Sequence, residues 1–397
     1  MIYLDNNATT KVDEKVLEAM LPYFKDEYFN ASSMYEFSRS ASRAIRDARG
    51  KIKDFINAAS EREIIFTSCG SESANMAIRG VLSYNRSKRH IITTAVEHPC
   101  VMNTYKSFEN QGYEVDYIGV NSCGELDLEE LRAKIRKDTA LVSVMWANNE
   151  TGIVFPIREI SEIIKSKNPD TKLFVDAVQV AGKLPIDVQE NGIDLLSISG
   201  HKFHAPKGIG VLYVNAKTSI TPLITGGHQE RGLRAGTENV PYIAGIGVAA
   251  ELATDALNYE LTEVKRLRDK LESGILSSIY SARLNTSISN RVPNTTNIGF
   301  EYIEGELILL HLSDLGICAS SGSACTSGSL EPSHVLRAMG IPFTSLHGSI
   351  RFSLSKYTTE KEIDYVLAQL PAVIEKLNKI SPYQQELAHL KACFTKN

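Results

Sequence analysis

Several polar residues of this sequence directly follow short apolar runs that are typical of strands. The first such group is the small-residue segment 68–73, which opens a helical pattern. Free backbone N–H groups at a helix N-terminus can bind an anion such as phosphate, although Ser71 could also be a plain N-cap. His98 follows the next run. There a histidine could cap a helix, lie in a core or stack on a planar aromatic ligand.

An acid and an amine occupy similar positions further along the chain. Asp176 ends an apolar run, and Lys202 follows another one. A buried carboxylate needs a partner, which could be a pyridinium N–H, an arginine or a metal ion. Partial burial lowers the pKa of a lysine and makes it a usable amine nucleophile, whereas most lysines simply face solvent.

The order of these features indicates a particular cofactor. Enzymes that use pyridoxal 5′-phosphate (PLP) need donors for its phosphate, an acid at its ring nitrogen and an amine for a Schiff base. The chain offers a phosphate turn, a stacking histidine, an acid and a lysine, each after a predicted strand. Open parallel sheets bind ligands at the carboxyl ends of their strands, so the four features would meet at one edge.

Between about residues 60 and 215, short apolar runs alternate with helical patterns such as 157–166. The runs that we interpret as strands are 63–67, 91–94, 115–118, 141–145, 173–176 and 195–199. This alternation predicts an α/β fold with a mostly parallel sheet covered by helices on both faces. The run 209–214 follows a turn too short for a parallel crossover, so we expect it to pair antiparallel.

The pattern of predicted helices and strands changes beyond about residue 255. Helical patterns at 261–275, 304–315 and 359–378 accompany strand candidates at 295–300 and 349–354. We therefore expect a large cofactor-binding domain over 15–255 and a smaller α+β domain formed by 1–14 and 256–397. The smaller domain would carry Cys325 in the Ser/Gly-rich loop 319–329.

Composition bounds the class of protein. The chain has 397 residues, 43% of them hydrophobic and 23% charged, which suits about two well-packed domains. A net charge of −4 gives no electrostatic footprint for nucleic acid. The N-terminus lacks a signal-peptide pattern, and we see no run of roughly 18 apolar residues that would span a membrane. We expect a cytoplasmic protein with reduced cysteines; none of the six forms a C-x-x-C pair.

From residue 1 to about 385 the chain closely resembles the NifS/IscS family of cysteine desulfurases, within the aminotransferase-like fold (fold type I) of class-V PLP enzymes. The NifS branch, linked to nitrogenase cluster assembly, is the most similar. The residues that carry the resemblance are 3–10 (YLDNNATT), 97–99 (EHP), 145–152 (MWANNETG), 176–179 (DAVQ), 200–202 (GHK), 226–231 (GGHQER), 234–239 (RAGTEN) and 320–334 (SSGSACTSGSLEPSH). The family usually has Thr where this chain has Ser71, so the hydroxyl is kept.

The resemblance implies a role for each matching residue. Lys202 would be the Schiff-base lysine, His98 would stack on the ring and move protons, and Cys325 would accept sulfur. The implied cofactor-binding residues are Gly70, Ser71, Asn149, Asp176 (ring nitrogen), Gln179 (ring hydroxyl), Ser199, His201, Lys202 and the partner subunit's Thr237. Asn149 and Arg351 would hold the carboxylate of the substrate.

The implied reaction takes sulfur from L-cysteine and leaves L-alanine and a Cys325 persulfide. A guanidinium offers a two-pronged match to the substrate carboxylate, although Arg351 could instead form a structural salt bridge. A thiol attacks as its thiolate, so Cys325 needs a base, a nearby cation or the substrate itself to remove its proton. A flexible loop suits a sulfur carrier, but a structural loop cysteine is the plainer alternative.

Other activities remain open on the sequence alone. A selenocysteine lyase or an aminotransferase would use the same fold. A sulfur carrier without catalysis could hold a persulfide on Cys325, which could then ligate an iron–sulfur cluster transiently, although four protein thiolates are usual for a stable cluster. The resemblance also implies a homodimer, and delivery of sulfur to an iron–sulfur scaffold or another acceptor protein.

Overall fold

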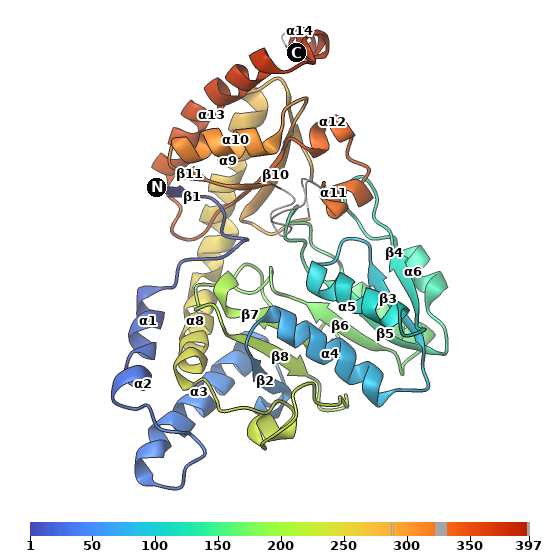
Figure 1. Cartoon of the computed structure of the whole chain (residues 1–397), viewed down its shortest axis with the longest axis vertical. Helices are drawn as coiled ribbons and strands as arrows, with labels where there is room; N and C mark the ends of the chain where they lie inside the picture. The colour runs from blue at the N-terminus through green and yellow to red at the C-terminus, as the bar shows by residue number, and fades with distance from the viewer. Residues whose placement is uncertain (287, 289, 322–331, 395–397) are drawn as a thin grey trace.

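The structure, a computed structural model, describes residues 1–286, 288, 290–321 and 332–394. It consists of a larger α/β domain and a smaller domain at one end of the molecule (Figure 1). From edge to edge, the larger sheet contains β2 (Ile64–Thr67), β8 (Gly210–Val214), β7 (Leu195–Ser199), β6 (Lys172–Asp176), β5 (Thr139–Met145), β3 (His90–Thr94) and β4 (Glu114–Ile118). All neighbouring pairs are parallel except those that β8 makes with β7 and β2. The expected α/β fold and the antiparallel β8 are confirmed.

Both faces of this sheet are covered, which explains why its strands other than the edge strand β4 are buried along nearly their whole length without alternation. Successive residues point to opposite faces: Ile65 joins the core formed with α4 (Gly70–Tyr84) and α5 (Pro99–Glu109). Its neighbours Ile64 and Phe66 join the other core. The helices that pack there include α3 (Arg39–Phe55), α7 (Ile157–Lys167) and α8 (Val240–Tyr259). The sheet is therefore a rigid support for whatever follows its strands.

The smaller domain has its own core. Its sheet contains, in order, β12 (Ser320–Ser321), β13 (Ser349–Ser353), β10 (Thr295–Phe300) and β9 (Ala282–Leu284), and β1 (Ile2–Tyr3) pairs with β11 (Ile317–Cys318). The helices of this part are α9 (Lys265–Ser278), α10 (Gly305–Asp314), α11 (His334–Ala338), α12 (Phe343–Leu346), α13 (Glu360–Ile380) and α14 (Gln384–Phe394). Leu4, near the N-terminus, belongs to this second core. The remaining helices are α1 (Glu14–Met20), α2 (Pro22–Lys25) and α6 (Leu128–Lys134).

One long helix joins the two domains. Helix α8 continues through a π-helical turn, Glu260–Val264, directly into α9, so the predicted helix at 261–275 is part of a longer element. The predicted boundary at residue 255 falls inside α8, and the domain limits stay predictions. By length and apolar composition, 240–278 could cross a membrane. Core helices of soluble proteins meet the same criterion, and α8 packs along α3 and α1 in the larger domain. Our expectation of no membrane span stays a prediction.

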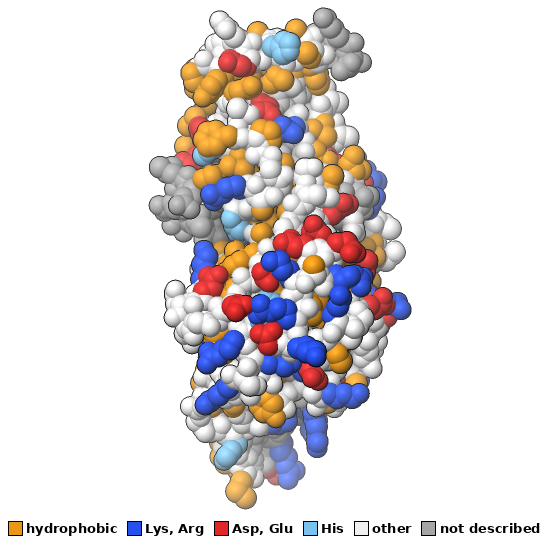
Figure 2. All heavy atoms as spheres, turned by 90° about the vertical axis from the view of Figure 1, so that its right-hand side faces the viewer, with side chains coloured by type: hydrophobic (Ala, Val, Ile, Leu, Met, Phe, Trp, Pro, Cys, Tyr) orange, Lys and Arg blue, Asp and Glu red, His pale blue; other side chains and the backbone are white. Residues whose placement is uncertain are grey.

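The two domains differ in surface character. Figure 2 shows Lys, Arg, Asp and Glu side chains gathered over the larger domain, with more apolar and uncharged surface over the smaller domain above it. Exposed apolar side chains of the smaller domain include Leu310, Phe343 and Ile380.

Candidate active site

A cavity of about 350 Å³ lies at the carboxyl ends of the parallel strands. The residues that line it are Asn7, Ala8, Cys69, Gly70, Ser71, His98, Cys100, Met145, Ala147, Asn149, Asp176, Val178, Gln179, Ser199, His201, Lys202 and Arg351. All the residues assigned to the site from the sequence are therefore brought together here, apart from Thr237 and Cys325. The topology explains this convergence, because parallel strands end at the same edge of a sheet.

Asp176 ends β6 and is 7% exposed. Its Oδ1 accepts hydrogen bonds from the Val178 N–H at 3.0 Å and the Ser197 hydroxyl at 3.4 Å. Burial raises the pKa of Asp176, and the nearby His98 and Lys202 oppose that shift. A positively charged N–H placed beside this carboxyl would hold it in its charged form.

Gln179 lies one turn beyond Asp176 and is also buried. Its amide group donates to the carbonyl of Asn7 at 3.1 Å. The Oε1 atom of the same side chain is buried and has no hydrogen-bond partner among the described residues. A buried acceptor without a donor is costly, so this oxygen favours a ligand that carries a hydroxyl or N–H.

His98 is the N-cap of α5, whose first residue is Pro99. Its Nδ1 accepts the backbone N–H of Cys100 at 3.2 Å. In the neutral ring the proton must therefore sit on Nε2. Burial lowers the pKa of His98; Lys202 adds to this effect and Asp176 opposes it. The neutral form is thus favoured near pH 7.

Lys202 stands in a single 3₁₀ turn, Gly200–Lys202, directly after β7. Its Nζ donates to the carbonyl oxygens of Asn7 at 2.5 Å and Ala8 at 2.8 Å. The N-terminal segment therefore closes over the end of the large sheet. The Asn7 side chain fixes this segment by donating to the Thr295 hydroxyl at 2.8 Å and to the Asn149 carbonyl at 3.2 Å.

A group of residues at the start of α4 and the end of β7 forms the phosphate end of the cavity, which we define as Gly70, Ser71, Ser199 and His201. Cys69 is the N-cap of α4, and its sulfur accepts the Glu72 N–H at 3.4 Å. The N–H groups of Gly70 and Ser71 have no acceptor within the described chain. Burial lowers the pKa of His201 to about 4, with Lys202 acting in the same direction, so its imidazole is neutral.

Gly70 is needed at this point for reasons of space. A Cβ atom there would lie 3.0 Å from Val178 Cγ2 and 3.4 Å from Ser199 Cβ, both in cavity-lining residues. A side chain would thus fill the place where the helix N-terminus meets the cavity.

Arg351 lies on β13, lines the same cavity and is 2% exposed. Its two terminal nitrogens donate to the Asn149 carbonyl at 3.0 Å and to Asp5 Oδ1 at 2.8 Å. Its Nε atom has no partner in the part of the chain that the structure describes. One edge of the guanidinium is therefore held in place, and its Nε remains for a further acceptor.

These observations fit PLP. The phosphate end offers N–H groups and the neutral His201, Asp176 offers an acid, and Gln179 offers an unpaired acceptor for a ring hydroxyl. Lys202 offers a primary amine between them. The volume of about 350 Å³ suits a small organic ligand.

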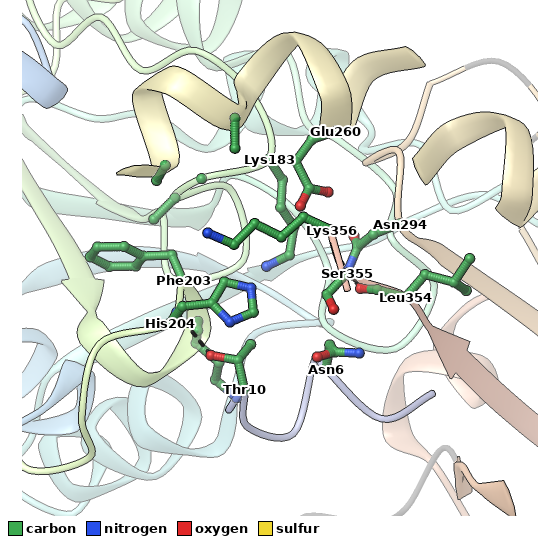
Figure 3. Close-up of a pocket in the computed structure, with 15 residues that line it drawn as sticks. Asn6, Thr10, Lys183, Phe203, His204, Glu260, Asn294, Leu354, Ser355 and Lys356 are labelled. Carbon is green, nitrogen blue, oxygen red and sulfur yellow. Dashed lines mark hydrogen bonds between the residues drawn. The ribbon is translucent and has the colours of Figure 1, made fainter. Parts of the chain in front are cut away.

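A second, smaller cavity of about 20 Å³, which Lys202 also lines, is shown in Figure 3. It contains the buried pair Lys183 and Glu260, whose Nζ and Oε2 atoms lack hydrogen-bond partners among the residues described. Burial lowers the pKa of Lys183 to about 7 and raises that of Glu260 to about 7. Sequence analysis missed this pair, because nothing local marks either residue as buried.

One residue assigned from the sequence lies outside the cavity, and one lies outside the described part of the chain. Thr237 is exposed and does not line it. Cys325, with its implied roles as sulfur acceptor and transient iron–sulfur ligand, lies outside the described residues. The described chain on either side borders the site: Ser321 pairs with Ile350, next to Arg351, and His334 Nε2 lies 2.9 Å from the Glu97 carbonyl, next to His98.

Sequence analysis also missed other residues of the cavity. Cys69 and Cys100 entered only among the cysteines that we expect to be reduced, yet both line the cavity, and burial raises the pKa of the Cys100 thiol. Asp5 entered only as part of a matching motif, yet it is the ion-pair partner of Arg351. Their positions just after strands, or within the N-terminal motif, were the available signal.

Comparisons with known proteins agree with this geometry. The chain matches the model of the class-V aminotransferase family over residues 2–366. It is 56% identical to a cysteine desulfurase of Nostoc sp. over 388 residues, covering 98% of this chain and 96% of that protein. It is 51% identical to the cysteine desulfurase NifS of Azotobacter vinelandii, covering 96% and 94%. A solved NifS-like protein superimposes with a TM-score of 0.89 at 40% identity, covering 95% of this chain and all of that one.

Proposed function

This chain belongs to the class-V aminotransferase family, and we propose that it is a PLP-dependent cysteine desulfurase that converts L-cysteine to L-alanine and leaves a persulfide on Cys325. The observation that supports this most strongly is the convergence of Lys202, Asp176, Gln179 and His98 on one cavity that Arg351 also lines. The near full-length identity to named cysteine desulfurases supports the choice of reaction within the family.

The residues that would hold the cofactor divide its functional groups among them. Lys202 would bind it covalently through Nζ, Asp176 would face the ring nitrogen and Gln179 Oε1 would accept from the ring hydroxyl. The phosphate end would receive the phosphate. When bound, PLP withdraws electrons from the substrate and so weakens bonds near its α-carbon.

Proton transfer falls to His98 and Lys202. The Cys100 N–H fixes the neutral His98 with its proton on Nε2, so this ring can stack and donate from a defined atom. The carbonyls of Asn7 and Ala8 accept hydrogen bonds from Lys202 Nζ, and they hold this group beside the N-terminal segment.

Arg351 would orient the substrate. Asp5 and the Asn149 carbonyl occupy its terminal nitrogens and fix the guanidinium plane, and Nε is available to a carboxylate. The Asn149 side chain lines the same cavity and would provide a second donor.

In the sulfur-transfer step, the Cys325 thiolate would attack the sulfur of the substrate. An S–S bond forms, the bond between the substrate sulfur and its β-carbon breaks, and its electron pair stays on the carbon skeleton. That skeleton takes up a proton and leaves as alanine, so atoms and electrons balance without an external oxidant.

The partners follow from the same proposal. We expect a homodimer, because Thr237 is exposed and free to serve the phosphate end of a second copy. Exposed apolar side chains around α1 and α2, at the lower left of Figure 1, also suit an interface with another chain. They are Leu17, Leu21, Phe24, Tyr28, Met34, Tyr35 and Phe37. The persulfide would pass to an iron–sulfur scaffold or another acceptor in the cytoplasm, and the NifS relative favours nitrogenase cluster assembly.

The experiment that tests the proposal measures alanine and sulfide release from L-cysteine, with a reductant present. The wild type should be yellow and release both in equal amounts. Cys325→Ala should stay yellow and release neither, whereas Cys123→Ala, which removes an exposed cysteine, should behave like the wild type. A colourless, inactive wild type would refute the cofactor assignment, and a fully active Cys325→Ala would refute the acceptor assignment alone.

A further inference from the structure

An acidic side chain lies in the same first helical turn as the proposed phosphate end, although it does not itself line the cavity. Glu72 lies in the first turn of α4, two residues after Gly70, and is 10% exposed. Its Oε2 accepts the Ser68 N–H at 2.7 Å, which holds the carboxylate at the helix N-terminus. A carboxylate there already interacts favourably with the positive end of the helix dipole. It also repels a phosphate dianion that is brought to the adjacent N–H groups.

Arg234 compensates this charge. Its Nε donates to Glu72 Oε1 at 2.8 Å and its Nη2 donates to Oε2 at 3.2 Å, a two-pronged contact. Although burial raises the pKa of Glu72, the bonds from Arg234 and Ser68 outweigh it and keep the group below its usual value. Glu72 is therefore charged and is paired with Arg234.

The segment that carries Arg234 is held by other contacts as well. Arg49 pairs with Glu230 through two bonds of 2.7 and 2.8 Å, and the side chain of Arg231 donates to the Arg62 and Ile64 carbonyls. Glu230 and Arg231 both have positive φ values, 46° and 60°, so these contacts maintain an uncommon backbone. These contacts hold the loop without Glu72. A change in the charge at Arg234 should therefore leave the structure of the loop in place.

We propose that Arg234 is a positioning residue for the cofactor phosphate: by pairing with Glu72, it lets the N-terminus of α4 accept a dianion. This inference rests on the proposed function, since it takes PLP as the ligand. Arg234 does not line the cavity, so it would act on the bound phosphate only through Glu72. The same loop carries the exposed Thr237, so one loop would tune the phosphate end of its own subunit and face the other subunit.

The test compares PLP affinity of the full-length, cofactor-free variants by absorbance titration, with pyridoxal, which lacks the phosphate, as the matched ligand. Arg234→Gln should bind PLP at least about tenfold more weakly than the wild type but bind pyridoxal equally well. The double variant Glu72→Gln/Arg234→Gln, which also lacks the ion pair, should recover to within about threefold of the wild type. Arg231→Gln, which removes a different anchor of the loop, should change PLP affinity little.

The outcomes separate the two levels of inference. A wild type that binds no PLP would refute the proposed function itself. A double variant as weak as Arg234→Gln, or an equal loss for PLP and pyridoxal, would show that the pair only supports structure and would overturn the inference. If Arg234→Gln does not fold, Arg234→Lys decides: near wild-type PLP affinity supports the charge role, and an equal loss for both ligands overturns it.

Discussion

The buried Arg351 and the partly exposed Asp5 form an ion pair, with Nη2 and Oδ1 2.8 Å apart, between a strand of the smaller domain and the N-terminal segment. The pair occupies one edge of the guanidinium and leaves Nε without a partner among the described residues. Arg351 is thus structural on one side and available on the other. The sequence left open whether Arg351 binds the substrate carboxylate or forms a structural salt bridge, and this geometry allows it to do both.

Arg351→Lys should therefore impair substrate binding rather than cofactor binding. A lysine keeps the charge but cannot hold Asp5, the Asn149 carbonyl and a carboxylate in one plane. We expect KM for L-cysteine to rise about tenfold or more, with unchanged PLP absorbance. The control is Arg283→Lys on strand β9, which β10 separates from β13. Arg283 pairs with Glu301, and its replacement should leave KM unchanged. Loss of the PLP absorbance would contradict this assignment.

Gly70→Ala should weaken cofactor binding by filling the phosphate end. The new Cβ would meet Val178 at 3.0 Å, and overpacking of this kind costs about 1–3 kcal/mol. Titration with PLP measures the effect as a loss of roughly tenfold or more in affinity. Gly50→Ala, within helix α3, has only a 3.4 Å contact with Glu61 and should keep full affinity. Equal affinities for the two variants would show that the cavity tolerates a methyl group at position 70.

Glu97 should make the protein less stable as the pH rises. Burial raises its pKa to about 8, above the usual 4.5, so the folded state binds the proton more tightly. Its stabilising contribution is complete below about pH 4.5 and is lost as the pH rises through 8. Glu97→Gln, which stays neutral, should gain stability relative to the wild type by up to about 1.4 kcal/mol per pH unit in this window. Urea unfolding at pH 5 and pH 8 measures the difference, and a pH-independent difference would exclude a neutral Glu97.

Glu260→Gln should destabilise the junction between the domains. The charge of Glu260 partly opposes the lowering of the Lys183 pKa by burial, so its removal should destabilise the folded state where Lys183 is protonated, and this cost relative to the wild type should disappear as the pH rises above the folded pKa of Lys183, about 7. Lys183→Met/Glu260→Gln removes both charges and should stay within about 1 kcal/mol of the wild type. Glu263→Gln, in the same π-helical turn but at the surface, is the control and should have little effect. Thermal unfolding of the wild type and the three variants measures this order of stability. A double variant less stable than Glu260→Gln would contradict the prediction.

The sequence by itself determined the α/β class, the order of the strands' polar endings and most of the cavity. These properties are local: an apolar run of five residues predicts a buried strand, and the residue after it must lie at the sheet edge. That is why Asp176 and Lys202 could be placed together although 25 residues separate them in the chain. The resemblance of whole motifs to those of the cysteine desulfurases added the expected substrate, L-cysteine.

Only the tertiary structure decided which atoms remain available for a ligand. Lys202 reaches the carbonyls of Asn7 and Ala8 across more than 190 positions, and Arg351 meets Asp5 across 346 positions. The unpaired Gln179 Oε1 and the pairing of Arg234 with Glu72 likewise depend on packing between distant segments. No local pattern encodes such contacts, because the choice of partner is made by long-range packing and by the burial that removes water as an alternative.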